Sequence, residues 1–318
     1  MAKVEKLDTI PERNRTLPVK VTEMGNVIEI QYMSHRNNKQ TIQMLPGKEE
    51  FLVLSSGEVK EITHGTTRKD NKKSLYRTFA NARAVINSNV TDVSRVRWCT
   101  LTYAENMTDT VRLYDDFLKF NKRFQYYCMK HDYGSPEYIV MMEPQGRGAW
   151  HAHLLYIWED RKAPFIPNSE FAELWGHGFV KIKKLDNVDN VGAYLTAYLG
   201  DMELENLGDV TDSDRLKYAD VVDDNGQVTR KAFVKGARLD LYPMGFKLLR
   251  CSRGVKRPIE NMITQLEAEE KVLGATKTFE SALKLTDDQS DFETIIIKEQ
   301  YNRIRSKNQQ KCITADNQ

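Results

Sequence analysis

Two of the chain's six histidines, His151 and His153, stand one residue apart within the stretch GRGAWHAHLLYIW. The apolar residues that follow them predict a buried β-strand. Successive side chains of a strand point to opposite faces, so residues 151 and 153 would share one face and aim both imidazoles at one point. That geometry suits a divalent cation, although pairs of half-buried histidines that bind no metal are also common.

A carboxylate is expected beside the two imidazoles. Turn-forming residues 144–150 (PQGRGAW) separate the histidine strand from a second predicted strand, residues 137–143 (EYIVMME), which indicates a hairpin. If those seven residues form the loop, Glu143 lies directly opposite His151 on the same face of the sheet. A shift of register by one residue would turn Glu143 to the other face. We therefore expect Glu143, His151 and His153 to bind a divalent metal ion, and this mixed nitrogen and oxygen set suits Mn²⁺ or Mg²⁺ as well as Zn²⁺.

Two tyrosines four residues apart are a second candidate for chemistry. Tyr194 and Tyr198 lie in NVGAYLTAYL, residues 190–199, which predicts a helix capped by Asp189 and ended by Gly200. Residues four apart lie one above the other on a helix, so both hydroxyls would project from the same side. Tyrosines on amphipathic helices are more often packing residues with a wet hydroxyl, so the pair alone does not identify a nucleophile.

Other elements must position these groups. A buried strand is expected over residues 97–103, and a helix with its cap at Ser74 is expected to follow a polar linker, residues 64–73. Residues 109–127 predict an amphipathic helix. Its apolar face would consist of Leu113, Phe117, Phe120 and Phe124.

The two ends of the chain predict different structures. Residues 1–65 contain short strand-like segments (VKVTEM, VIEIQYM, EFLVLSS) between turn residues, which predicts a small β-rich unit. Residues 259–318 are polar and predict a loosely attached helical tail. Residues 66–258 are then expected to form the main domain, so the chain as a whole is predicted to belong to the α+β class.

The bulk composition narrows the class of protein. Charged residues make up 29% of the chain and the hydrophobic set 40%, an ordinary balance for a soluble globular protein. No apolar run approaches the length of a membrane span, and the first residues lack the core of a signal peptide. The four cysteines are scattered without a CxxC pair. We expect a cytoplasmic protein with no membrane partner, no disulfide framework and no cysteine-rich zinc site.

The net charge of +2 conceals separate acidic and basic blocks. Residues 201–224 hold nine acids against two basic residues, whereas residues 230–257 hold nine Lys/Arg against Asp240 alone. The pair Asn225-Gly226 between them is a strong hairpin signal. Such basic blocks predict nucleic-acid binding, with a merely solvated surface as the alternative. The residues expected to contact DNA are Arg147, Arg250, Arg253, Lys256 and Arg257.

Three motifs in this order resemble those of the HUH endonucleases, specifically the rolling-circle replication initiators of plasmid and filamentous-phage type. Trp98–Thr102 (WCTLT) is similar to the first motif, His151-Ala152-His153 to the histidine motif, and Tyr194–Tyr198 to the tyrosine motif. The resemblance covers roughly residues 70–258. It implies a central antiparallel sheet with the histidine strand in the middle and helices packed on one side.

The resemblance also implies a reaction. Tyr194 and Tyr198 would be the catalytic tyrosines, and Tyr194 is expected to make the first nick in single-stranded origin DNA of the protein's own replicon. A 5′-phosphotyrosine link and a free 3′-OH would result, and the strand would later be rejoined. Many relatives have lysine three residues after the catalytic tyrosine, where this chain has Ala197 or Asp201. No GxxxxGK[ST] motif is present, so a separate host helicase and polymerase are the expected partners.

Three alternatives remain open at this point. A conjugative relaxase or a transposase would use the same chemistry. A non-catalytic regulator would bind an origin or operator through the basic block. A metallohydrolase with an HxH site would act on small molecules. Substitution of both tyrosines separates these classes, because only a tyrosine-dependent enzyme would lose its activity.

Overall fold

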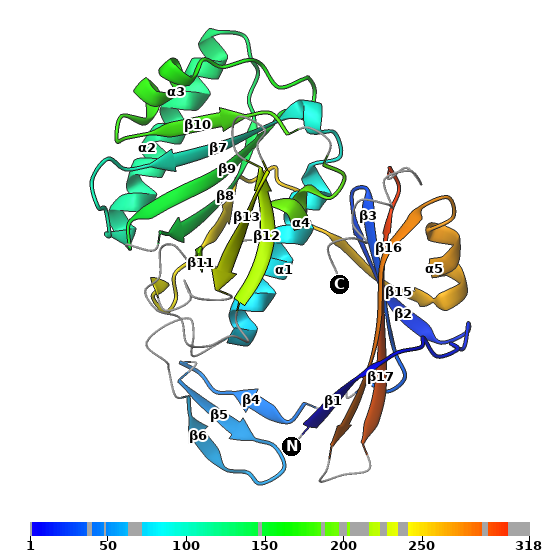
Figure 1. Cartoon of the computed structure of the whole chain (residues 1–318). Helices are drawn as coiled ribbons and strands as arrows, with labels where there is room; N and C mark the ends of the chain where they lie inside the picture. The colour runs from blue at the N-terminus through cyan, green and yellow to red at the C-terminus, as the bar shows by residue number, and fades with distance from the viewer. Residues whose placement is uncertain are drawn as a thin grey trace. The chain divides into compact units, whose positions relative to one another are not determined.

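The computed structural model describes residues 2–36, 40–47, 49–62, 72–145, 148–185, 188–196, 202–203, 216–222, 228–234, 241–287 and 292–304. The protein is of the predicted α+β class. The chain divides into two compact units, one made of Met1–Gly65 with Ile259–Gln318 and the other of Thr66–Pro258 (Figure 1). None of the helices in the described part is long and apolar enough to cross a membrane.

The main sheet of the second unit has five antiparallel strands in the order β10-β7-β9-β8-β14. Their bounds are Val96–Thr102 (β7), Glu137–Pro144 (β8), Trp150–Ile157 (β9), Val180–Lys183 (β10) and Leu249–Cys251 (β14). The 3₁₀ turn Val93–Arg95 leads into β7. The histidine strand β9 is the central strand, as the resemblance implied.

Strand β9 is buried along almost its whole length, so both of its faces are covered. Ala152, Leu154 and Tyr156 point to one face and are buried, whereas His151, His153 and Leu155 point to the other. A strand buried on both faces reads as a continuous apolar run, which explains the LLYIW sequence after the histidines.

Helices α2 (Thr110–Lys130) and α3 (Asn168–Trp175) cover the face of the sheet opposite the histidines. The ring of Phe124 lies 4.3 Å from that of Tyr156 in β9, and Phe171 of α3 packs edge-on against Phe124. The apolar face predicted for residues 109–127 is confirmed, since Leu113, Phe117, Phe120 and Phe124 are all buried. Asp109 caps α2 by accepting hydrogen bonds from the backbone of Val111 and Arg112.

Helices α1 (Lys72–Asn89) and α4 (Val191–Thr196) lie on the histidine face. The sheet is therefore covered on both sides, and the implied one-sided packing is wrong. Ser74 is not a cap, because α1 already begins at Lys72, and lysine favours a helix. The cap of α4 is Asn190 and not Asp189, since the Oδ1 of Asn190 accepts from the backbone of Ala193.

A small three-stranded sheet completes this unit. It contains β11 (Met202–Glu203), β12 (Leu216–Val222) and β13 (Val228–Val234) in the order β11-β13-β12. Strands β12 and β13 pair antiparallel from Leu216 with Val234 to Val222 with Val228. That pairing agrees with the predicted hairpin, although Asn225-Gly226 itself lies outside the described residues.

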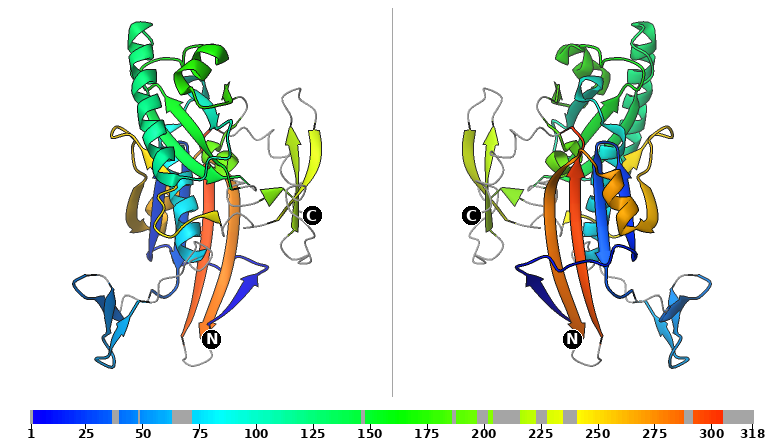
Figure 2. Two further views of the ribbon diagram at one scale, coloured as in Figure 1. Left: turned by 90° about the vertical axis from the view of Figure 1, so that its left-hand side faces the viewer. Right: turned by 90° about the vertical axis from the view of Figure 1, so that its right-hand side faces the viewer.

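The first unit is built around a six-stranded antiparallel sheet in the order β1-β16-β17-β3-β2-β15 (Figures 1 and 2). Its elements are β1 (Ala2–Leu7), β2 (Pro18–Met24), β3 (Val27–Met33), β15 (Ile259–Thr264), α5 (Gln265–Lys271), β16 (Thr276–Asp287) and β17 (Glu293–Asn302). A separate sheet holds β4 (Ile42–Met44), β5 (Glu50–Val53) and β6 (Val59–Glu61).

The prediction of a helical C-terminal tail is wrong. Strands β15, β16 and β17 pair with β2, β1 and β3, so the C-terminal segment completes a sheet begun by the N-terminal one. The alternation of buried and exposed residues, with β-branched Thr294 and Ile297 among the buried ones, favours strands. The high content of charged residues concealed this pattern, because charges occupy many alternate positions of β16 and β17.

Candidate functional site

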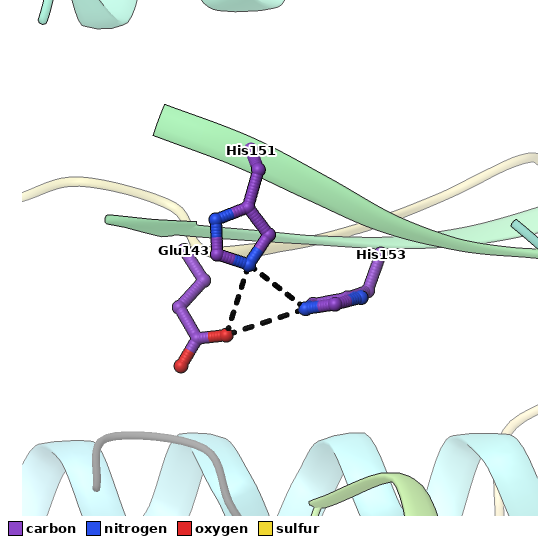
Figure 3. Close-up of side chains that lie close together, drawn as sticks. All are labelled: Glu143, His151 and His153. Atoms are coloured by element: carbon purple, nitrogen blue, oxygen red, sulfur yellow. Dashed lines mark hydrogen bonds and ion pairs between the residues drawn. The ribbon is translucent and has the colours of Figure 1, made fainter. Parts of the chain in front are cut away.

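The hairpin register that brings a carboxylate to the histidines is confirmed. Strands β8 and β9 pair so that Glu143 lies opposite His151 and Met141 opposite His153. The three polar side chains thus share one face of the central sheet. They project toward the side on which α1 lies (Figure 3).

These side chains form a tight triangle. The Nε2 atoms of His151 and His153 are 2.9 Å apart, and the Oε2 atom of Glu143 is 3.4 Å from each of them (Figure 3). Glu143 and His151 are buried, with 3% and 6% of their surface exposed, while His153 is partly open to solvent. The triangle is thus shielded on one side and accessible on the other.

The spacing of the triangle fits a divalent cation. Ligand atoms about 2.1 Å from an ion and about 90–110° apart lie about 2.9–3.4 Å from one another. The three measured edges agree with this range, and the carboxylate and two imidazoles form the one group of three or more such ligands found in the described part of the chain. Mn²⁺, Mg²⁺ and Zn²⁺ all accept such donors.

Strand β7 holds the histidines from the side. Thr100 lies opposite His153, and Thr102 lies opposite His151. The Oγ1 atom of Thr100 is 3.4 Å from Nδ1 of His153, the ring nitrogen that does not face Glu143. Such a contact fixes the orientation of a ligand ring, which gives the threonines of the WCTLT motif a physical role.

Trp98 joins the triangle to the tyrosine helix. Its ring centroid is 6.0 Å from that of His153 and 5.9 Å from that of Tyr194, which meets it edge-on. Tyr194 remains 49% exposed, so its hydroxyl is not buried by this packing. The structure therefore brings Tyr194 to the same face as Glu143, His151 and His153, whereas Tyr198 lies outside the described residues.

Helix α4 is short and depends on α1 for its position. The buried side chain of Asn87 accepts a 2.7 Å hydrogen bond from the backbone of Gly192 and donates a 2.9 Å bond to the cap residue Asn190. Arg83 also donates to the hydroxyl of Thr196. Sequence reasoning missed Asn87, because a single asparagine in a helix gives no local signal of a distant partner.

The residues predicted to contact DNA are scattered. Arg147 lies outside the described residues. The guanidinium of Arg250 stacks 3.5 Å from the ring of Tyr114 in α2, on the face of the sheet opposite the triangle. Lys256 forms a 2.8 Å ion pair with Glu159. Arg253 and Arg257 are exposed. The structure thus separates Arg250 from the histidine face.

Comparison with known families adds an independent observation. Residues 96–203 match the family model of the replication-associated protein ORF2/gene 2 protein. The match runs from the first residue of β7 to the last of β11 and contains the triangle and both tyrosines. It covers 108 of 318 residues, about a third of the chain, and is consistent with a replication initiator. No curated protein and no solved structure matches the chain.

Proposed function

We propose that this chain is a rolling-circle replication initiator that nicks single-stranded origin DNA by transesterification onto a tyrosine. The observation that carries the proposal is the triangle of Glu143, His151 and His153 with Tyr194 on the same face of the sheet. The match of residues 96–203 to a replication-associated family supports it. A small-molecule hydrolase or a metal-free regulator has no use for an exposed tyrosine at this place.

The three ligands would hold the cation at the scissile phosphate. Bound there, a divalent cation polarises the phosphate and stabilises the charge that develops on the leaving oxygen. Thr100 keeps the ring of His153 turned so that Nε2 faces the site, and the buried Glu143 supplies the negative charge. Trp98 closes the gap between the triangle and α4, which limits the positions open to the tyrosine ring.

Tyr194 is the proposed nucleophile of the first step. A free tyrosine has a pKa near 10, so its hydroxyl must lose a proton to solvent or to a nearby base as it attacks. The tyrosine oxygen forms a bond to phosphorus while the bond from phosphorus to the 3′ oxygen breaks. The 3′ oxygen takes up a proton and becomes the free 3′-OH, and the 5′ phosphate stays on the tyrosine.

The covalent link preserves the energy of the phosphodiester bond. A second tyrosine, for which Tyr198 is the proposed residue, or the new 3′-OH can therefore attack in turn and rejoin the strand without ATP. Host polymerase would extend the 3′-OH, and a separate helicase would open the duplex, with the reaction taking place in the cytoplasm. A relaxase or transposase shares the cleavage step and differs in the substrate that is joined.

The direct test is to incubate the full chain with single-stranded origin DNA of its replicon and Mn²⁺ and to look for a covalent protein–DNA adduct. The wild type is expected to form the adduct and Tyr194→Phe to form none. Tyr126→Phe is a matched control, because Tyr126 is exposed on α2. An adduct that maps to neither Tyr194 nor Tyr198, or its complete absence, contradicts the proposal.

A further inference from the structure

The edge strand β10 places two lysines on the same face as the triangle. Lys181 lies opposite Thr100 in β7, and Thr100 lies opposite His153 in β9. Side chains directly opposite each other across a sheet point to the same side, so Lys181 shares its face with His153. In the same way Lys183 lies opposite Trp98.

The alternation of β10 confirms this orientation. Val180 is buried, with 1% of its surface exposed, and lies opposite Leu101 on the face covered by α2 and α3. Lys181 and Lys183 therefore point the other way, and Lys183 is exposed. Neighbouring strands are about 4.8 Å apart, so Lys181 starts about 10 Å from His153, a span that its side chain can partly cover.

The two lysines concentrate positive charge at this edge. Partial burial lowers the pKa of Lys181, and the neighbouring charge of Lys183 lowers it further. Two cations this close repel each other, and a polyanion that contacts both relieves the repulsion. Residues two apart on a strand are about 6.6 Å apart, comparable to the spacing of successive phosphates in an extended nucleic-acid strand.

An exposed aromatic residue continues the same line. The carbonyl of Phe179 accepts hydrogen bonds from the backbone and the hydroxyl of Thr102, at 2.9 and 2.8 Å, so Phe179 lies beside the residue that faces His151. Its ring is 64% exposed. Exposed aromatic rings next to basic residues are the usual platform for unpaired bases.

We propose that Phe179, Lys181 and Lys183 form a track that binds single-stranded DNA next to the scissile phosphate, with phosphates on the two lysines and a base stacked on Phe179. The inference rests on the proposed function and adds the path of its substrate. It assigns the contacts nearest the site to β10, since Arg250 stacks on the opposite face. The occupant is single-stranded, because bases paired within a duplex offer no free face to a side chain.

The test measures binding and not cleavage. A fluorescein-labelled oligothymidine is titrated with the full chain in EDTA at several salt concentrations, and the affinity is followed by fluorescence anisotropy. Each phosphate contact that is lost lowers the slope of log affinity against log salt by about 0.7, so Lys181→Gln with Lys183→Gln is expected to lower it by about 1.4. Phe179→Ala is expected to weaken binding by about 5- to 150-fold.

The matched control is Lys119→Gln with Lys122→Gln, because both lysines are exposed on α2 at the opposite face. This pair is expected to leave the slope unchanged. A slope that is equally steep in the β10 variant, or that falls as much in the control, overturns the proposal. Melting temperatures of the variants equal to the wild type show that they are folded.

The track and the nicking reaction fail in different ways. A changed slope without any covalent adduct in Mn²⁺ contradicts the nicking activity and leaves the track standing. An adduct with an unchanged slope overturns the track alone. A tighter hold on the duplex of the same length than on the single strand also overturns it.

Discussion

The backbone amide of Gly192 donates a 2.7 Å hydrogen bond to the side chain of Asn87, and this bond ties the tyrosine helix α4 to α1. A Cβ atom at position 192 would clash with the carbonyl oxygen of Arg83, which is backbone and cannot move aside. Only glycine permits so close an approach of the two helices. The place of Tyr194 on the sheet is thus set by a residue two positions before it.

We expect Gly192→Ala to displace α4 and to slow formation of the covalent adduct by at least about tenfold, since a displacement of about 1 Å can cost about a hundredfold in rate. Affinity for Mn²⁺, measured by titration calorimetry, is expected to stay unchanged because the ligands are on β8 and β9. Ala193→Ser is the control, one residue along the same helix. Equal rates for wild type and Gly192→Ala would show that α4 does not depend on this contact.

The sequence was sufficient to predict the triangle, because its members lie on one hairpin. The hairpin loop fixes the register, and the register fixes which residues share a face. The same local logic identified the apolar face of α2. Asn87 escaped prediction because its partners Asn190 and Gly192 lie more than a hundred positions away, and nothing within α1 marks it.

The ends of the chain failed for a related reason. Strands β16 and β17 form a long hairpin whose other neighbours, β1 and β3, are at the opposite end of the sequence. Their buried positions include Glu299, which reads as a solvent-facing residue unless its distant partner Arg13 is known. A pattern with a charge at an inward position resembles a polar helix more than a strand.

Loss of the metal ligands is expected to follow their chemistry. His151→Ala and His153→Ala are predicted to abolish measurable Mn²⁺ binding and cleavage, while binding of single-stranded DNA in EDTA stays within a few-fold of wild type. Glu143→Gln is predicted to weaken Mn²⁺ binding less, because the amide keeps an oxygen donor but loses the charge. Unchanged metal affinity in any of the three variants, measured by calorimetry, would remove that residue from the site.

The basic segment after β14 is expected to contribute to DNA binding apart from Arg250. Neutralising Arg253, Lys256 and Arg257 is predicted to lower the salt slope for single-stranded DNA by up to about 2. Arg250→Ala is predicted to leave the slope unchanged and to cost about 1 kcal/mol of stability, because the guanidinium would no longer stack on Tyr114. A reversed pattern, with the slope sensitive to Arg250 alone, would refute this division.

Acid is expected to weaken the first unit through Glu299. Ion pairs with Arg13 and Lys277 hold the pKa of this buried carboxyl at about 2, below its usual 4.5. The folded state therefore binds a proton less readily than the unfolded state. The stabilisation is complete above about pH 4.5 and is lost as the pH falls toward 2.

Glu299→Gln tests this linkage. At pH 7 it is predicted to cost roughly 3 kcal/mol of unfolding free energy in urea titrations, because two buried cations lose their partner. The difference from wild type should shrink as the pH is lowered below 4.5. Glu280→Gln is the control, since Glu280 pairs with the same lysine but is a third exposed, and it should cost less than about 1 kcal/mol. A pH-independent difference would contradict the assignment.

The two tyrosines are expected to divide the reaction. One turn of helix separates positions 194 and 198, so only one hydroxyl at a time would stand in line with the leaving oxygen. Tyr194→Phe keeps the edge contact with Trp98 and removes only the oxygen, so it is predicted to abolish the first nick while the fold is preserved. Tyr198→Phe is predicted to nick at nearly the wild-type rate and to release little circular product. Peptide mapping of the DNA-linked protein decides the order, and a phosphotyrosine found at position 198 alone would reverse the two roles.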